Sequence, residues 1–269
     1  MYRRLLRGVT LAAASLLLAA APEQTRPTVM LMTGLPLVWG EKGPFEGGSR
    51  PAAAYVGLAG EFDLRPVDVL DARTLERGRN LFLAQPYRLA PAELAALDGW
   101  IRRGGRALIL TDPVLAWPST LPLGDIRRPP STGLLAPLLG HWRVTLEPPA
   151  ETGQVEVRWN GRRILLDSPG RLRSAGPECV VEAEWTARCR LGRGTVRLVA
   201  DADLMRDSLW ESSGADNPAV VGEWLDELAG VSRSRPGQGR ADRTWIVASA
   251  AMLALLAGIG LLLRRRGTR

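Results

Sequence analysis

Two short apolar runs, residues 81–84 and 107–111, flank a segment with helical periodicity. Neither run alternates with polar residues, which is typical of strands buried on both faces. Between them Pro91 suits a first helical turn, apolar side chains recur at positions 94, 97 and 101, and a glycine pair ends the periodicity. The pattern predicts a right-handed strand–helix–strand unit, and therefore a parallel sheet between layers of helices.

The flanking patterns extend this unit on both sides. On the N-terminal side the pattern predicts strands over 28–33 and 64–70, with a helix over 51–62 between them. On the C-terminal side it predicts a buried strand over 195–200 and a final helix over 217–228. The fold class predicted is α/β, a mainly parallel doubly wound, Rossmann-like sheet. The long loop over 34–50 and a proline-rich segment after Asp112 are expected to lie over the strand ends, with a short helix at 133–139.

Residues 141–193 have a different pattern. Valines at 155 and 157 alternate with polar residues, and Asn160–Gly161 is a strong hairpin signal before a returning strand over 162–166. Residues 179–185 and 187–191 are a second predicted strand pair. We expect a small antiparallel, β-rich insertion in the sheet.

Both ends of the chain are apolar and basic. Residues 1–21 carry three arginines before a short apolar run, which predicts a signal peptide or, if it is not cleaved, an N-terminal anchor. Residues 244–263 are uncharged and end in three arginines, which predicts a transmembrane helix with a cytoplasmic basic tail at 264–269; a buried core helix is the alternative. A polar linker over 231–243 would connect this helix to a periplasmic domain at 28–230.

The net charge of +7 belongs to these ends. Of the 35 basic side chains seven are terminal arginines, which leaves 28 to balance the 28 acidic residues of the body. Basic residues beside apolar segments indicate membrane topology, so we expect no nucleic acid partner. The predicted location is the bacterial inner membrane, with the domain in the periplasm.

Two segments carry a family resemblance. The first segment resembles the core of class I glutamine-amidotransferase-like domains and reads LFLAQPYRLAPAELAALDGWIRRGGRALILTDP. The second resembles their closing strand, acidic loop and last helix and reads RLVADADLMRDSLWESSGADNPAVVGEWLDELAG. More narrowly, they are similar to the auxiliary domain of ABC-transport systems related to gliding motility. The resemblance covers residues 28–112 and 195–263. It implies transporter subunits as partners and a membrane helix directly after the domain.

The catalytic residues of an amidotransferase are missing. Such an enzyme needs a cysteine on the turn after a buried strand with a histidine beside it, but here that turn reads Leu110-Thr111-Asp112-Pro113. The single histidine, His141, is interpreted as structural or exposed. There is no G-x-S-x-G elbow, zinc pattern or P-loop, so we expect no enzyme activity, no cofactor and no metal.

Ligands of open parallel sheets bind beyond the carboxyl ends of the strands. The candidate binding residues are chosen on that basis and follow the predicted strands or lie in the irregular segments: Gly34, Trp39, Gln85, Asp112 and Asp203. Trp117 and Trp142 are further candidates for lining a cleft. Asp201, Asp203 and Asp207 form an acidic cluster that could hold a hard cation, although capping of backbone N–H groups is the better-supported interpretation.

The two cysteines are predicted to form a disulfide. Cys179 and Cys189 flank a predicted strand–turn–strand, where opposed Cα atoms come within disulfide range, and an exported domain meets an oxidising compartment. Two separate buried thiols are the alternative.

The sequence therefore favours a membrane-anchored, non-catalytic periplasmic accessory or scaffold domain of an ABC-type transport system. A small-molecule sensor, or an atypical hydrolase that uses the strand-end cleft, is the alternative.

Overall fold

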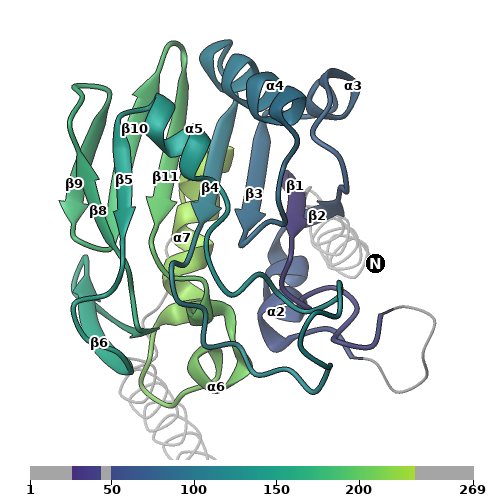
Figure 1. Ribbon diagram of the computed structural model, residues 1–269, viewed down its shortest axis with the longest axis vertical. Coiled ribbons are helices and arrows are strands. Elements are labelled where there is room, and N and C mark those ends of the chain that lie inside the picture. Colours follow the sequence, from purple (N-terminus) through teal and green to yellow (C-terminus); the bar gives the residue numbers. More distant parts are fainter. Residues whose placement is uncertain (1–25, 44–49, 234–269) are drawn as a thin grey trace, which may run out of the picture.

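The computed structural model describes residues 26–43 and 50–233, and its centre is the predicted strand–helix–strand unit (Figure 1). Strand β3 covers Asn80–Ala84, helix α4 covers Pro91–Arg102 and strand β4 covers Arg106–Leu110. The two strands are parallel, as predicted. Gly105 is required between helix and strand, because a Cβ there would lie 2.4 Å from the ring of Trp100.

Seven strands form the main sheet, in the order β2-β1-β3-β4-β11-β10-β9. The five strands from β2 to β11 pair in parallel, whereas β10 and β9 are antiparallel. The strands not yet introduced are β1 (Thr28–Thr33), β2 (Asp63–Pro66), β9 (Cys179–Ala183), β10 (Thr186–Leu191) and β11 (Gly194–Val199).

Helices cover both faces of the sheet, as expected for a doubly wound fold (Figure 1). Helices α2 (Ala53–Glu61) and α7 (Asn217–Ala229) bury Leu58 and Leu225 in the core of one face. The core of the other face includes Leu97 of α4 and residues of the short helices α3 (Ala72–Leu75) and α5 (Ala136–His141). The sheet is therefore the middle of three layers.

The predicted fold class needs two corrections, of which the first concerns the β-rich insertion. Its strands do not form one separate unit, because β9 and β10 extend the main sheet and make it mixed. The hairpin at Asn160–Gly161 forms as predicted, between β6 (Gln154–Trp159) and β7 (Arg162–Asp167). A further pair joins β5 (Val144–Glu147) to β8 (Arg171–Ser174), which the sequence pattern did not indicate.

The second correction concerns the transmembrane helix in the predicted fold class. Within residues 26–43 and 50–233, no helix is both long and apolar enough to cross a bilayer. The predicted span at 244–263, the basic tail and the N-terminal segment 1–21 all lie outside the described residues.

Two smaller differences occur between strands β2 and β3. The strand predicted over 64–70 ends at Pro66, where proline removes a ladder donor. Helix α3 was not predicted; the carboxylate of Asp71 caps it by accepting from Thr74 N at 2.8 Å.

After β11 the chain forms a 3₁₀ turn, η1 (Asp203–Met205), and the short helix α6 (Asp207–Trp210).

Candidate functional site

Three of the five predicted site residues follow adjacent parallel strands at the carboxyl edge of the sheet. Gly34 follows β1, Gln85 follows β3 and Asp112 follows β4, with the three strands adjacent in the sheet. The backbone N–H of Gly34 donates to the carbonyl oxygens of Ala84, at 3.3 Å, and Gln85, at 3.1 Å. The sequence thus located this edge correctly.

Gln85 joins the neighbouring strand ends through its side chain. Its amide nitrogen donates to the carbonyls of Asp112, at 3.1 Å, and Pro130, at 3.0 Å, and its oxygen accepts from Asp112 N at 2.8 Å. The side chain is buried, and its backbone has a φ of 45°, in the left-handed region. Its amide nitrogen and oxygen hydrogen-bond to the chain's own backbone, so Gln85 has a structural role at this edge.

The proline-rich segment after Asp112 closes the edge from outside. A Cβ on Gly34 would lie 2.5 Å from the Gln85 carbonyl oxygen and 2.9 Å from Pro130 Cδ. A Cβ on Gly133 would lie 2.3 Å from the Thr111 hydroxyl, which is buried and has no hydrogen-bond partner among the described residues. The segment fills the space where a ligand of an open sheet would lie.

Asp112 is fully buried below this segment. Its two carboxylate oxygens accept from Val114 N, at 2.8 Å, and from Ala202 N, at 3.0 Å. Burial raises the pKa of Asp112 to about 7, against the opposing effect of these hydrogen bonds. The carboxyl group thereby stabilises the loops that follow β4 and β11, and it has no access to solvent.

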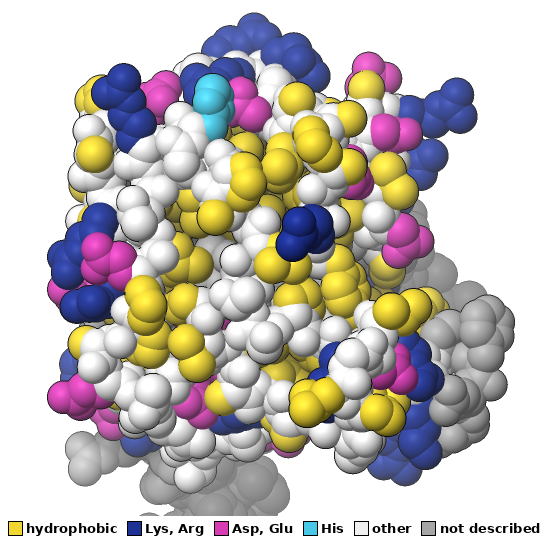
Figure 2. Space-filling view, in the orientation of Figure 1, with side chains coloured by type: hydrophobic (Ala, Val, Ile, Leu, Met, Phe, Trp, Pro, Cys, Tyr) yellow, Lys and Arg dark blue, Asp and Glu magenta, His cyan; other side chains and the backbone are white. Residues whose placement is uncertain are grey.

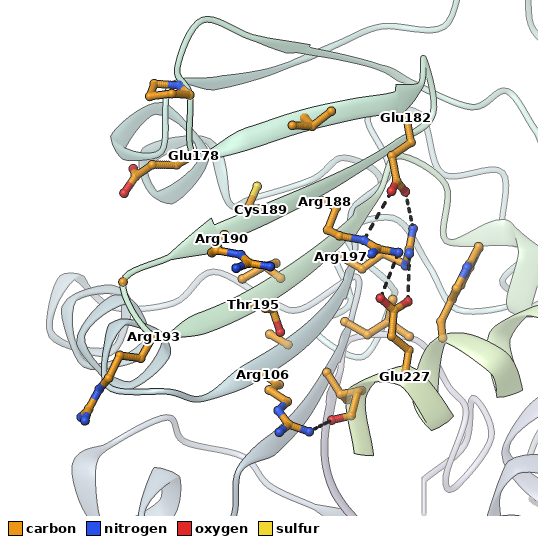
Figure 3. A pocket seen from close by; sticks show the side chains of 18 residues that line it. Arg106, Glu178, Glu182, Arg188, Cys189, Arg190, Arg193, Thr195, Arg197 and Glu227 are labelled. Carbon is orange, nitrogen blue, oxygen red and sulfur yellow. Dashed lines mark hydrogen bonds and ion pairs between the residues drawn. The ribbon is translucent and has the colours of Figure 1, made fainter. Parts of the chain in front are cut away.

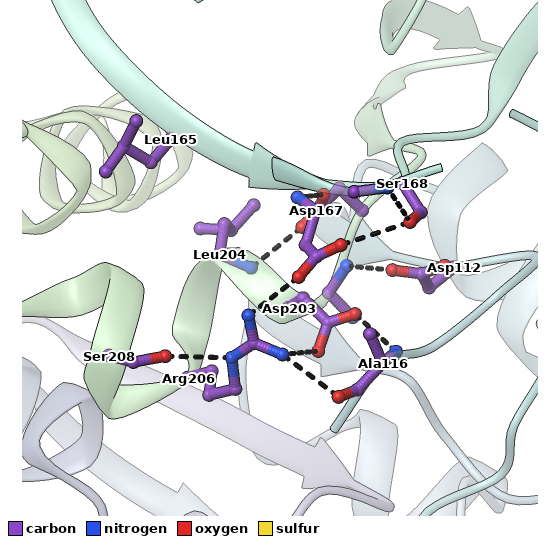
Figure 4. Close-up of polar contacts among 12 residues, drawn as sticks. Asp112, Ala116, Leu165, Asp167, Ser168, Asp203, Leu204, Arg206 and Ser208 are labelled. Atoms are coloured by element: carbon purple, nitrogen blue, oxygen red, sulfur yellow. Dashed lines mark hydrogen bonds and ion pairs between the residues drawn. The ribbon is translucent and has the colours of Figure 1, made fainter. Parts of the chain in front are cut away.

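Asp203 lies near Asp112 in a buried polar layer (Figure 4), to which the buried Asp201 also belongs. Asp201 accepts from the backbone N–H groups of Asp167 and Leu204, each at 2.7 Å, and Asp203 accepts from Ala116 N at 2.6 Å. Burial raises the pKa of Asp203 to about 6 and that of Asp201 well above its usual value.

The acidic cluster does not have the geometry expected from an extended strand. Asp203 begins η1, so it does not continue the strand that ends before Asp201, and Asp207 is exposed and accepts from Ala53 N at 2.9 Å. Each of the three carboxylates accepts from backbone N–H groups, which is the capping interpretation. Within the described residues, no group of three or more acidic, His or Cys side chains is placed to hold a metal ion.

Sequence reasoning missed Arg206 and Asp167, which complete the layer. The Arg206 guanidinium lies 2.7 Å from Asp167 Oδ2 and donates to Ala116 O at 2.9 Å (Figure 4). It thereby joins the β7 end, η1 and the proline-rich segment. The one sequence signal for this ion pair was an arginine inside an acidic run. Asp167 comes from the β-rich region, and only the fold brings it close to Arg206.

The three tryptophans proposed for a cleft lie in different environments. Trp39 is 55% exposed and, with Gly34, lines a hollow of about 280 Å³ beside the ends of β1 and β2. Trp117 is half-buried against the core. The interpretation of Trp142 was wrong: it is 1% exposed and donates to Asp98 Oδ1 at 2.8 Å, because α5 packs it against α4.

The cysteines and the histidine are far from forming a catalytic pair. Cys179 and Cys189 lie opposite each other in β9 and β10 and form a disulfide, with their Cα atoms 4.0 Å apart. His141 is on the surface, where it is the cyan side chain of Figure 2, with its Nε2 atom 3.7 Å from Asp98 Oδ2. With both sulfurs bonded to each other, neither is a thiol nucleophile.

Comparison with known proteins gives one family match. Residues 26–151, a little under half of the chain, match the family described as "ABC-type uncharacterized transport system". This supports the ABC-transport auxiliary part of the resemblance; the glutamine-amidotransferase-like part is not confirmed. The match extends into the β-rich region but does not include β11 and α7. No curated protein matches the sequence.

Two solved structures that resemble the chain do so at low sequence identity. The structure titled "mmIFT52 N-terminal domain" has a TM-score of 0.52 and 12% identity, over 77% of this chain and 100% of that one. An exo-β-1,4-mannosidase, Op5Man5 from Opitutaceae bacterium strain TAV5, gives a TM-score of 0.47 and 10% identity over 76% of this chain. The similar region is 36% of the mannosidase's length. At such identities the first similarity concerns the fold alone.

Proposed function

We propose that the domain is a non-catalytic accessory of an ABC-type transport system, that it works outside the cytoplasm, and that it acts by binding other proteins. The observation that carries the proposal is the closed carboxyl edge of the sheet. Residues that would face a ligand there, Gln85 and Asp112, are buried and bonded to the chain's own backbone. The family match over residues 26–151 supports the transport system as the setting.

The surface beside the closed edge supports protein binding. Trp39, Tyr87 and Ile126 all line the 280 Å³ hollow and are 55%, 43% and 89% exposed. In Figure 2 hydrophobic side chains reach the surface over these loops, at the lower right, next to charged ones. Exposed aromatic and apolar side chains around a shallow hollow are typical of a protein contact, and aromatic residues contribute most binding energy there.

The test is affinity purification of the full chain from its native membranes. We expect an ATPase and a permease to co-purify with the wild type, and their recovery to fall in the variant Trp39→Ala/Ile126→Ala. Val56→Ala is the matched control, because Val56 is 58% exposed but lies on helix α2. Absence of transporter subunits from the wild-type preparation, relative to a mock purification, would contradict the proposal.

A ligand sensor is the second candidate, and the same hollow is the observation that favours it. Its volume of about 280 Å³ lies just below the range for ligand pockets, roughly 300–1,000 Å³, so it would take only a small molecule. A small molecule that raises the melting temperature of the wild type but not of Trp39→Ala would favour sensing over protein binding.

A further inference from the structure

A second concave surface lies on the sheet face that α7 covers, beyond the edge of that helix (Figure 3). Strands β4, β11, β10 and β9 form its floor, and Trp224, Glu227 and Leu228 of α7 form one wall. We call this 1140 Å³ hollow the arginine groove. It lies apart from the closed carboxyl edge, and neither the sequence patterns nor the family match points to it.

Four charged side chains of the groove neutralise one another. Arg197, only 7% exposed, bridges Glu182 at 2.8 Å and Glu227 at 2.9 Å. Arg188 contacts the same two carboxylates, at 3.3 and 2.9 Å. Two arginines and two glutamates therefore leave no net charge. Figure 3 shows the four side chains converging at one end of the groove.

The remaining acidic residue of the groove is also paired. Glu178 Oε1 lies 3.2 Å from Arg102 Nη1, a residue of α4 outside the groove. All three glutamates are thus committed to arginines. What remains unbalanced in the groove is a set of three positive charges: Arg106, Arg190 and Arg193.

These three arginines have no acidic partner among the described residues. Arg106 donates to the carbonyl of Leu228 at 3.0 Å, near the end of α7. Arg190 and Arg193 are exposed, and within residues 26–43 and 50–233 their side chains make no hydrogen bond or ion pair. Unpaired cations gathered in a concavity raise the local positive potential and attract anionic groups.

The turn between β10 and β11 fixes the position of Arg193. Gly192 has a φ of 58°, and a Cβ there would lie 2.7 Å from Arg102 O. At Gly194 a Cβ would lie 2.0 Å from Ile101 O. The turn is therefore packed directly on the end of α4, so Arg193 projects from a rigid turn.

We propose that the arginine groove binds an acidic helix of a partner protein. Its floor spans neighbouring strands spaced about 4.8 Å apart, so three strands offer the roughly 10 Å width of one helix lying beside α7. The floor carries the charged side chains of Arg188, Arg190 and Arg197 among apolar ones, with Val180 as its exposed large apolar side chain, and these charges favour a charged partner over a purely apolar one. The proposal does not depend on the transport role.

The test is a titration of the full chain with a fluorescein-labelled, Ala/Glu helical peptide of about 20 residues, followed by anisotropy at low ionic strength. We expect saturable binding by the wild type and binding about tenfold weaker in Arg190→Glu/Arg193→Glu. The matched control is Arg73→Glu/Arg77→Glu, which changes the net charge equally at exposed arginines around α3 and should bind as the wild type does. Circular dichroism should show the same fold for both variants.

Each other outcome overturns the proposal. Equal loss in both double variants would mean that net charge alone attracts the peptide. Equal binding by Arg190→Glu/Arg193→Glu and wild type would place the peptide elsewhere. Displacement of the peptide by inorganic pyrophosphate or single-stranded DNA at equal charge concentration would make the groove a general anion site. A dimer that forms in wild type and is lost in Arg190→Glu/Arg193→Glu would make the occupant a second copy of the chain.

Discussion

Gly34 is the residue at which the closed carboxyl edge leaves no room for a side chain. In Gly34→Ala the new Cβ would lie 2.5 Å from the Gln85 carbonyl and 2.9 Å from Pro130, so backbone must shift. We expect the free energy of unfolding to fall by about 1–3 kcal/mol in urea titrations. Gly60→Ala is the control: nothing lies within 4 Å of its Cβ, and alanine favours its helix by up to about 1 kcal/mol. Equal stability of the two variants would contradict the closed edge.

The buried carboxyl groups predict an unusual pH dependence of stability. Burial raises the pKa of Asp112 to about 7 and of Asp203 to about 6, above the value of 3.8 expected in the unfolded chain. A raised pKa stabilises the folded state below pH 3.8, and that stabilisation is lost as pH rises through 6 and 7. The free energy of unfolding should therefore be larger near pH 5 than near pH 8, by roughly 1–3 kcal/mol.

Asp203→Asn separates this effect from other titrations. The amide keeps one oxygen for Ala116 N but cannot ionise, so the difference in unfolding free energy between the two pH values should shrink. The same pH profile in wild type and variant would show that Asp203 does not titrate in this range.

At the scale of elements, the sequence correctly predicted those strands, helices and turns that local residue patterns determine. Strands β1 and β3, helices α4 and α7 and the hairpin at Asn160–Gly161 lie where periodicity and turn residues placed them. The destination of β9 and β10 could not be predicted, because a hairpin pattern does not say which sheet it joins. For the same reason Asp167 was missed as a partner of Arg206: 39 residues separate them, and only the fold brings them together.

The disulfide holds the outer strand of the main sheet, since it joins β9 to β10. Cys179→Ala/Cys189→Ala should lower the free energy of unfolding by about 2–3 kcal/mol, because the loop it closes is short. Dithiothreitol should shift the urea midpoint of the wild type toward that of the variant and leave the variant unchanged. A wild-type midpoint that does not respond to reduction, with the bond shown to be broken by mass, would contradict a stabilising role.

At the scale of the whole molecule, the closed edge predicts the absence of ordinary amidotransferase chemistry. The purified full chain should show no glutaminase or esterase turnover above background, since Thr111 and Asp112 are enclosed and both sulfurs are paired. Turnover that disappears in His141→Ala would contradict both this prediction and the structural interpretation of His141.

The compartment of the domain is the last property that the whole molecule predicts. The disulfide joining β9 and β10 requires an oxidising environment to persist, and the excess of positive charge lies at the two apolar ends of the chain. We therefore expect the domain outside the cytoplasm.

Cells would be lysed into denaturant with a thiol-alkylating reagent, and the intact mass of the protein measured. No alkylated cysteine before reduction and two after reduction are expected, and a reporter active only in the cytoplasm should be silent when fused after Gly230. Two alkylated cysteines without reductant, together with an active reporter, would place the domain in the cytoplasm and contradict the proposal.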